Sequence, residues 1–213
     1  EDGILNNAAD DEDLEDLEDL TDIADLNEAV EITEQGLKLN IDLGDKDHPA
    51  PPAVEVTPAD LAELAVVEAE LDTRWPETKI DPSLERIELL MDLLGSPQNS
   101  FPSIHVAGTN GKTSTVRMIE SLLRAFHRRT GRTTSPHLQL VTERIGIDGV
   151  PVHPRDYVRI WREIQPYVEL VDEKSGIRMS KFEVLTAMAY AAFADAPVDV
   201  AVVEVGMGGT WDA

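Results

Sequence analysis

Hydrophobic positions early in the second quarter of the chain recur at helical spacing. Thr57-Pro58 predicts a helix start, because Thr is a good N-cap and Pro suits the first helical position. We expect this helix to reach about Arg74, with an apolar stripe at Leu61, Leu64, Val67 and Leu71. A second helix is expected from Asp81-Pro82 to a stop at Gly95, with a stripe at Leu84, Ile87, Met91 and Leu94. Both helices are expected to cover a sheet.

The rest of the chain alternates between strand-like and helix-like patterns. Residues 103–107 form a short apolar strand segment, and 112–130 predict a helix with Met118, Leu122 and Phe126 on one face. Asp148-Gly149 inside 144–152 is a strong hairpin signal. Further helices are expected at 154–174 and 180–194. The β-branched run 198–205 is typical of a buried parallel strand. The predicted fold class is α/β, a mostly parallel sheet flanked by helices.

Charge separates the first part of the chain from the rest. The net charge is -24, and residues 1–60 hold 20 Asp/Glu against 2 Lys/Arg. We therefore expect residues 1–56 to be an acidic, disordered extension that ends in a Pro-rich linker, and residues 57–213 to be the folded unit. An acidic surface argues against a nucleic-acid partner, which would need cations for its phosphates.

Composition also indicates the cellular compartment in which the protein is expected. The chain has no cysteine, which favours a reducing compartment, and no run of about 18 apolar residues that predicts a membrane span. We expect a cytoplasmic monomer without a membrane partner.

Candidate chemistry begins at the loop "AGTNGKTS". Gly108, Thr109, Asn110, Gly111, Lys112, Thr113 and Ser114 lie between a predicted strand and a predicted helix. Backbone amides at a helix N-terminus bind anions, a Lys reaches the β- and γ-phosphates, and a Thr hydroxyl can meet Mg²⁺. The general phosphate-loop pattern asks for glycine where this chain has Val106. A Gly-rich turn with an exposed lysine is the alternative.

Other candidate groups follow later strands. Glu204 ends the apolar run, so its carboxylate is expected at the carboxyl edge of the sheet as a magnesium ligand or water-positioning group, with a strand-end ion pair to a lysine as the alternative. Ser135 precedes Pro136, which predicts an extended or turn conformation with a free hydroxyl. By itself that segment is only a loop.

Taken together, "GTNGKTS", "SPHL", "ERI", "FEVLTAMA" and "VVEVGMGG" with the closing "WDA" resemble folylpolyglutamate synthase/dihydrofolate synthase of the Mur ligase superfamily. The resemblance covers about residues 57–213 and accounts for the unusual glycine spacing. It implies an ATP-dependent amide ligase that adds L-glutamate to dihydropteroate or folate through an acyl phosphate. ATP and Mg²⁺ are the implied cofactors.

The resemblance also assigns residues. Lys112 and Glu204 are implied as catalytic, and Gly108–Ser114 as the triphosphate loop. Ser135 and Glu204 match the metal ligands, with Thr113 a weaker candidate. The loop 134–145 corresponds to the family's mobile loop near the folate site. Phe182 matches the residue on which the pterin stacks, and Asp212 matches the acid that bonds the ring; a core Phe and an Asp N-cap are the alternatives.

Two departures from the family pattern stand out. Thr210 takes the place of the family's usual Arg. The family also continues past "WDA" into further metal-site residues and a C-terminal domain, so we expect this stretch alone to be the N-terminal, truncated part of the central domain and to have little or no ligase activity. The alternatives are a UDP-N-acetylmuramoyl amino-acid ligase and a nonenzymatic NTP-binding module.

Overall fold

A computed structural model describes residues 30–33, 36–39, 54–75 and 84–206, in two units, residues 1–45 and 46–213. The first unit contains β1 (Val30–Thr33) and β2 (Gly36–Leu39), which pair antiparallel with Val30 opposite Leu39. This pair lies within residues 1–56, for which the sequence analysis expected an acidic, disordered extension.

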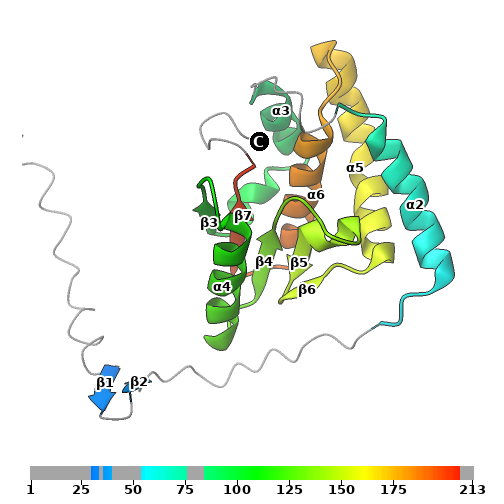
Figure 1. The fold of residues 1–213 in the computed structure, drawn as a ribbon. Helices are drawn as coiled ribbons and strands as arrows, with labels where there is room; N and C mark the ends of the chain where they lie inside the picture. Colours follow the sequence, from blue (N-terminus) through cyan, green and yellow to red (C-terminus); the bar gives the residue numbers. More distant parts are fainter. Residues whose placement is uncertain (1–29, 34–35, 40–53, 76–83, 207–213) are drawn as a thin grey trace, which may run out of the picture. The chain divides into compact units, whose positions relative to one another are not determined.

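The second unit is built on a five-stranded sheet (Figure 1). Its order is β3 (Ser103–Val106), β7 (Val200–Glu204), β4 (Thr130–Thr133), β5 (Ile145–Ile147) and β6 (Val150–Pro151). The first three strands are parallel, and the β5–β6 hairpin continues the sheet antiparallel. The hairpin turns at Asp148 and Gly149, both at positive φ as the dipeptide predicts. The mostly parallel α/β sheet is confirmed.

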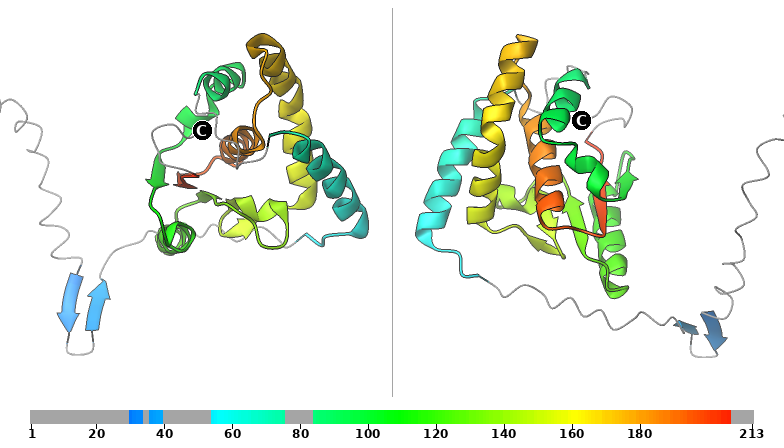
Figure 2. Two further views of the ribbon diagram at one scale, coloured as in Figure 1. Left: turned by 45° about the horizontal axis from the view of Figure 1, so that its top comes forward. Right: turned by 180° about the vertical axis from the view of Figure 1, so that it is seen from behind.

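Helices α4 (Lys112–Ala125) and α6 (Lys181–Asp195) cover opposite faces of this sheet (Figure 2). All five residues of β7 are buried between them, which confirms the predicted central strand. The predicted helix over 112–130 ends earlier than expected, because its last five residues belong to a turn and to the start of β4. Its expected apolar face is exposed at Met118 and Leu122, while Val116 and Glu120 are buried.

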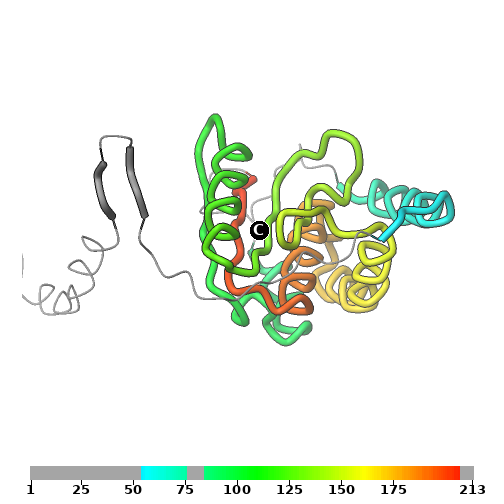
Figure 3. The backbone as a smooth tube through the Cα atoms, turned by 90° about the horizontal axis from the view of Figure 1, so that it is seen from below, coloured from blue at the N-terminus to red at the C-terminus, as the bar shows by residue number. Residues whose placement is uncertain are grey.

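Helices α2 (Pro58–Asp72) and α3 (Glu85–Leu93) occupy an outer layer. In Figure 3 helix α5 (Pro154–Ser175) lies between α2 and α6. The main contacts of α2 are with α5, and those of α3 are with α5 and α6. The expectation that both helices cover the sheet is therefore wrong. The predicted start at Asp81-Pro82 lies outside the described residues.

A capping box starts α2, in which Thr57 and Asp60 exchange backbone and side-chain hydrogen bonds. Asp60 is buried and also accepts from Nε of Arg155 on α5, whereas Leu61 is 41 % exposed. The sequence analysis expected Leu61 in the buried stripe. The residue buried at this turn is instead its neighbour Asp60. The ion pair to Arg155 explains why the acid, rather than the leucine, faces α5.

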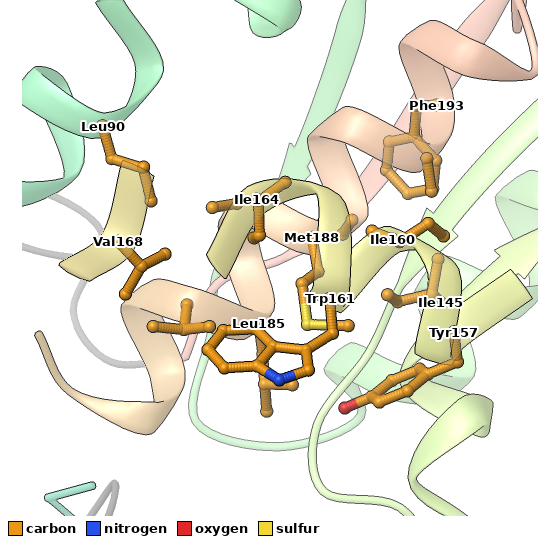
Figure 4. Packing of buried hydrophobic residues seen from close by; sticks show 14 of the residues in the cluster. Leu90, Ile145, Tyr157, Ile160, Trp161, Ile164, Val168, Leu185, Met188 and Phe193 are labelled. Carbon is orange, nitrogen blue, oxygen red and sulfur yellow. The ribbon is translucent and has the colours of Figure 1, made fainter. Parts of the chain in front are cut away.

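The hydrophobic core packs α5 against α6 and includes Leu90 of α3 and Ile145 of β5, both fully buried (Figure 4). Its α5 stripe repeats every three or four residues and consists of Tyr157, Ile160, Trp161, Ile164 and Val168. Burial raises the pKa of the Tyr157 hydroxyl above its ordinary value. None of the helices in the described part of the chain is long and apolar enough to cross a lipid bilayer.

Candidate nucleotide-binding site

The loop between β3 and α4 has the backbone geometry of an anion site. Gly108 has φ of +151° and Gly111 has φ of +75°, conformations in which glycine avoids the strain of a side chain. Gly111 is the N-cap of α4, and no side chain caps this helix start. The first-turn amides of a four-turn helix therefore point out of the loop together with the positive end of the helix dipole. This arrangement suits a phosphate.

Lys112, the first residue of α4, folds back over that loop. Its Nζ donates a hydrogen bond to the carbonyl oxygen of Gly108 at 2.9 Å. The ammonium group is thus held beside the helix N-terminus, where it can add a full positive charge to that of the backbone amides.

Glu204 connects the loop to a second part of the site. It ends β7, opposite Val106 at the end of β3, so both strands deliver their carboxyl ends to one sheet edge. Its carboxylate accepts the Thr113 hydroxyl, at 2.9 Å from Oε1 and 3.0 Å from Oε2. It also accepts the Ser135 amide at 3.1 Å. The structure therefore brings together all three residues that the sequence analysis assigned to the metal.

The donor set suits a hard cation. Among the described residues, no group of three or more His, Cys, Asp and Glu side chains is placed to hold a metal ion. A cation at Glu204 would take one carboxylate, hydroxyl groups, water and phosphate oxygens, which is the usual environment of Mg²⁺. The strand-end ion pair with a lysine is not what is observed, because Lys112 bonds Gly108 and Glu204 bonds Thr113.

The loop after Ser135 is organised by a residue that the sequence analysis did not single out. The Glu143 carboxylate accepts the amides of Leu138, Gln139 and Leu140 at 2.8–3.0 Å. These backbone hydrogen bonds, that of Leu140 foremost, lower the pKa of Glu143 to about 2. A Glu at the third position of the short helix Val141–Arg144 was the available signal, because such a residue commonly bonds preceding amides. His137 accepts from Arg144 Nε at 3.0 Å.

Phe182 faces the same region. It lies in the first turn of α6, after the Ser180 N-cap, and is half-buried. With Ser135, Arg144 and Glu204 it lines a small cavity of about 20 Å³. Glu204 also lines a larger cavity of about 300 Å³ beside α3. Asp212 and Thr210 lie outside the described residues, so the assignment of Asp212 to the pterin stays a prediction.

The sheet, the Gly108–Gly111 loop and the strand-end carboxylate together are typical of a nucleotide-binding α/β protein. No family model matches the chain. Among curated proteins it is 64 % identical over 177 residues to the dihydrofolate synthase/folylpolyglutamate synthase of Mycobacterium tuberculosis, covering 80 % of this chain and 36 % of that protein. The Bacillus subtilis enzyme of the same name is 36 % identical over 135 residues, which cover 63 % of this chain and 31 % of that protein.

Solved structures of enzymes from the same family also match this chain. The Mycobacterium tuberculosis folylpolyglutamate synthase complexed with ADP matches with a TM-score of 0.69 at 67 % identity, over 72 % of this chain and 34 % of that chain. Escherichia coli FolC in complex with DHPP and ADP matches with a TM-score of 0.63 at 34 % identity, over 74 % and 36 %. The predicted resemblance is confirmed: the chain is related over this region to the folylpolyglutamate synthase/dihydrofolate synthase family. It spans about a third of the length of these relatives.

Proposed function

We propose that this chain supplies the nucleotide-binding part of an ATP-dependent ligase that adds L-glutamate to dihydropteroate or to a folate. The observation that carries the proposal is the meeting of the Lys112 loop with Glu204, Thr113 and Ser135 at one sheet edge. The relatives bear the name of this activity, and solved neighbours hold ADP or DHPP.

In the proposed reaction a carboxylate oxygen of the pteroate or folate attacks the γ-phosphorus of ATP, and the bond to ADP breaks. The glutamate amine then attacks the acyl carbon, an amide forms, and phosphate leaves with the former carboxylate oxygen while the amine loses a proton. Catalysis of the first step is mainly positioning and charge neutralisation. The Gly108–Ser114 backbone and Lys112 would hold the triphosphate in line.

Glu204, Thr113 and Ser135 are the residues that would hold Mg²⁺. When bound, this ion supplies additional positive charge against the phosphate oxygens. Glu204 is a buried residue, 7 % exposed, and its carboxylate would fix the coordinating hydroxyl of Thr113 at the start of α4. Phe182 would offer a ring to the pterin. The monomeric state and cytoplasmic location belong to the same proposal.

Lys112→Ala tests the nucleotide site. We expect the dissociation constant of AMPPCP, measured by calorimetry, to rise at least tenfold, because the variant loses the charge held over the loop. The matched control is Lys174→Ala, an exposed lysine in the last turn of α5, which should stay within twofold of the parent. Equal affinity of parent and Lys112→Ala chains would show that the loop assignment is wrong.

The acceptor is tested separately. Dihydropteroate or folate should raise the melting temperature of the AMPPCP-bound chain, whereas a UDP-N-acetylmuramoyl substrate should not. The reverse result would favour the cell-wall ligase. Nucleotide binding with no response to either acceptor would favour a nonenzymatic NTP-binding module.

A further inference from the structure

A buried ion pair links the phosphate-loop helix to the sheet. Glu120 lies two turns after Lys112 on α4, and Arg132 lies at the centre of β4. Arg132 Nε is 2.7 Å from Glu120 Oε2, and the two side chains are only 5 % and 6 % exposed. Neither residue belongs to the nucleotide loop or contributes to the metal ligand set.

Each partner of this pair makes further hydrogen bonds. The Gly149 amide, in the β5–β6 turn, donates to Glu120 Oε1 at 3.1 Å. Arg132 Nη1 donates to the Thr134 hydroxyl at 3.2 Å and lies 3.5 Å from the Glu143 carbonyl oxygen. The pair therefore connects α4 with both ends of the loop that begins at Ser135.

Arg132 is also sterically confined. A Cβ atom on Gly146 of β5 would lie 2.7 Å from Arg132 Nη2, so the guanidinium packs directly against the neighbouring strand. Its planar fork can bond Glu120 and Thr134 at the same time, which the single ammonium of a lysine does less well. Thr134 precedes Ser135 directly, so the guanidinium bonds the residue next to the amide that meets Glu204.

Stability alone does not account for such a pair. Burying two charges is costly, and well-packed apolar replacements are often neutral or stabilising. We propose that Arg132 and Glu120 are positioning residues that hold the Ser135 loop and the phosphate-loop helix in register. The proposal rests on the proposed function, because the register matters where Ser135, Thr113 and Glu204 hold the metal of a metal–nucleotide complex.

Arg132→Lys is the sharpest test, because it keeps a positive charge for Glu120 but lacks the second arm that reaches Thr134. We expect AMPPCP affinity without Mg²⁺ to stay within twofold of the parent chain. The gain in affinity on adding Mg²⁺ should fall about tenfold. Amides of residues 134–140 should exchange their hydrogens faster in the ligand-free variant.

Arg74→Lys is the matched control. Arg74 is equally buried, pairs with Asp172 at 3.1 Å and donates to the Met179 carbonyl, all away from the nucleotide loop. The Arg74→Lys variant should lose stability as Arg132→Lys does, but it should keep the full gain in AMPPCP affinity on adding Mg²⁺. A merely structural role of Arg132 would make the two variants alike in this gain, and that result would overturn the proposal.

Two further outcomes are distinguishable. If Arg132→Lys does not fold, the uncharged pair Glu120→Gln/Arg132→Met replaces it and should show the same lost gain. If the parent chain binds no AMPPCP, the proposed function fails. Hydrogen exchange then remains as the test of whether Arg132 positions the Ser135 loop. Unchanged exchange of residues 134–140 in the variant would then overturn the positioning role.

Discussion

The hydroxyl of Thr113 lies within hydrogen-bond distance of both carboxylate oxygens of Glu204, at 2.9 and 3.0 Å. Thr113 is in the first turn of α4 and Glu204 ends β7, 91 residues later in the chain. One hydroxyl proton therefore ties the helix whose N-terminus faces the phosphates to the acidic edge of the sheet. Thr113 and Glu204 are therefore held together at the place where they would hold a cation.

Replacing Thr113 by Val should weaken this connection. The variant keeps the size and β-branching of Thr but leaves the buried Glu204 without its hydroxyl donor, which costs about 1–3 kcal/mol in stability. The AMPPCP dissociation constant in Mg²⁺ should rise by roughly tenfold, since a hydrogen bond to a charged group contributes about 1.5–3 kcal/mol. Calorimetry and thermal denaturation measure the two effects.

Thr113→Ser is the control for that change. Serine retains the hydroxyl, so both affinity and melting temperature should stay near the parent values. Equal losses in the Val and Ser variants would mean that the methyl group matters and that the bond to Glu204 does not.

Gly111 and Gly95 provide a matched pair of backbone positions. Both have positive φ, +75° and +81°, and an added Cβ would meet nothing within 4 Å at either one. Alanine at each should therefore cost about 1–2 kcal/mol through backbone strain alone. Only Gly111→Ala should also weaken AMPPCP binding, because Gly111 shapes the loop amides while Gly95 lies in the turn after α3. Equal AMPPCP affinity in both variants would contradict the loop assignment.

The Glu143 carboxylate should make the loop after Ser135 acid-sensitive. Its pKa in the folded chain, about 2, lies below its ordinary value of 4.5. The stabilisation is therefore complete above about pH 4.5 and is lost as the pH falls from there towards 2. Because the chain has no cysteine, a spin label at Leu138→Cys, which is 86 % exposed, reports on this loop alone. The mobility of this label should rise as the pH falls over the range in which Glu143 is protonated.

Glu143→Gln separates this effect from general acid unfolding. The labelled loop should then be mobile at every pH, without the acid transition. A label at Val66→Cys on α2, which is 55 % exposed, should keep its mobility until the whole unit unfolds. Simultaneous mobilisation at both positions in the parent chain would contradict a local role for Glu143.

Elements with a local signal were predictable from sequence. The buried strand β7, the helices α5 and α6 and the Asp148-Gly149 turn carry their periodicity or turn chemistry in a few neighbouring residues. Strand β4 carries no such local signal. Its sequence Thr-Gly-Arg-Thr is polar, and the buried Arg132 has its charged partner, Glu120, on α4. A partner from another element is invisible to periodicity.

The candidate site divides in the same way. The glycines and Lys112 were predictable because the phosphate loop is a contiguous motif. Glu204 was predictable at the carboxyl edge of the sheet, because it ends an apolar strand-like run. The metal role of Ser135 came from the family resemblance, since its own segment indicates only a loop. Glu143 and Arg132 were missed, because their importance lies in which backbone and side-chain groups the fold brings to them.

A substitution at Gly131 in β4 would test how closely α6 packs on this sheet. A Cβ atom there would lie 2.6–2.9 Å from three ring atoms of the buried Phe193. Gly131→Ala should therefore destabilise the chain by about 1–3 kcal/mol through overpacking, measured by urea denaturation. Phe193→Leu removes the ring, so the double variant should be more stable than the two separate losses predict. Additive losses would show that Gly131 is required for another reason, because a shared clash must appear as coupling between the two positions.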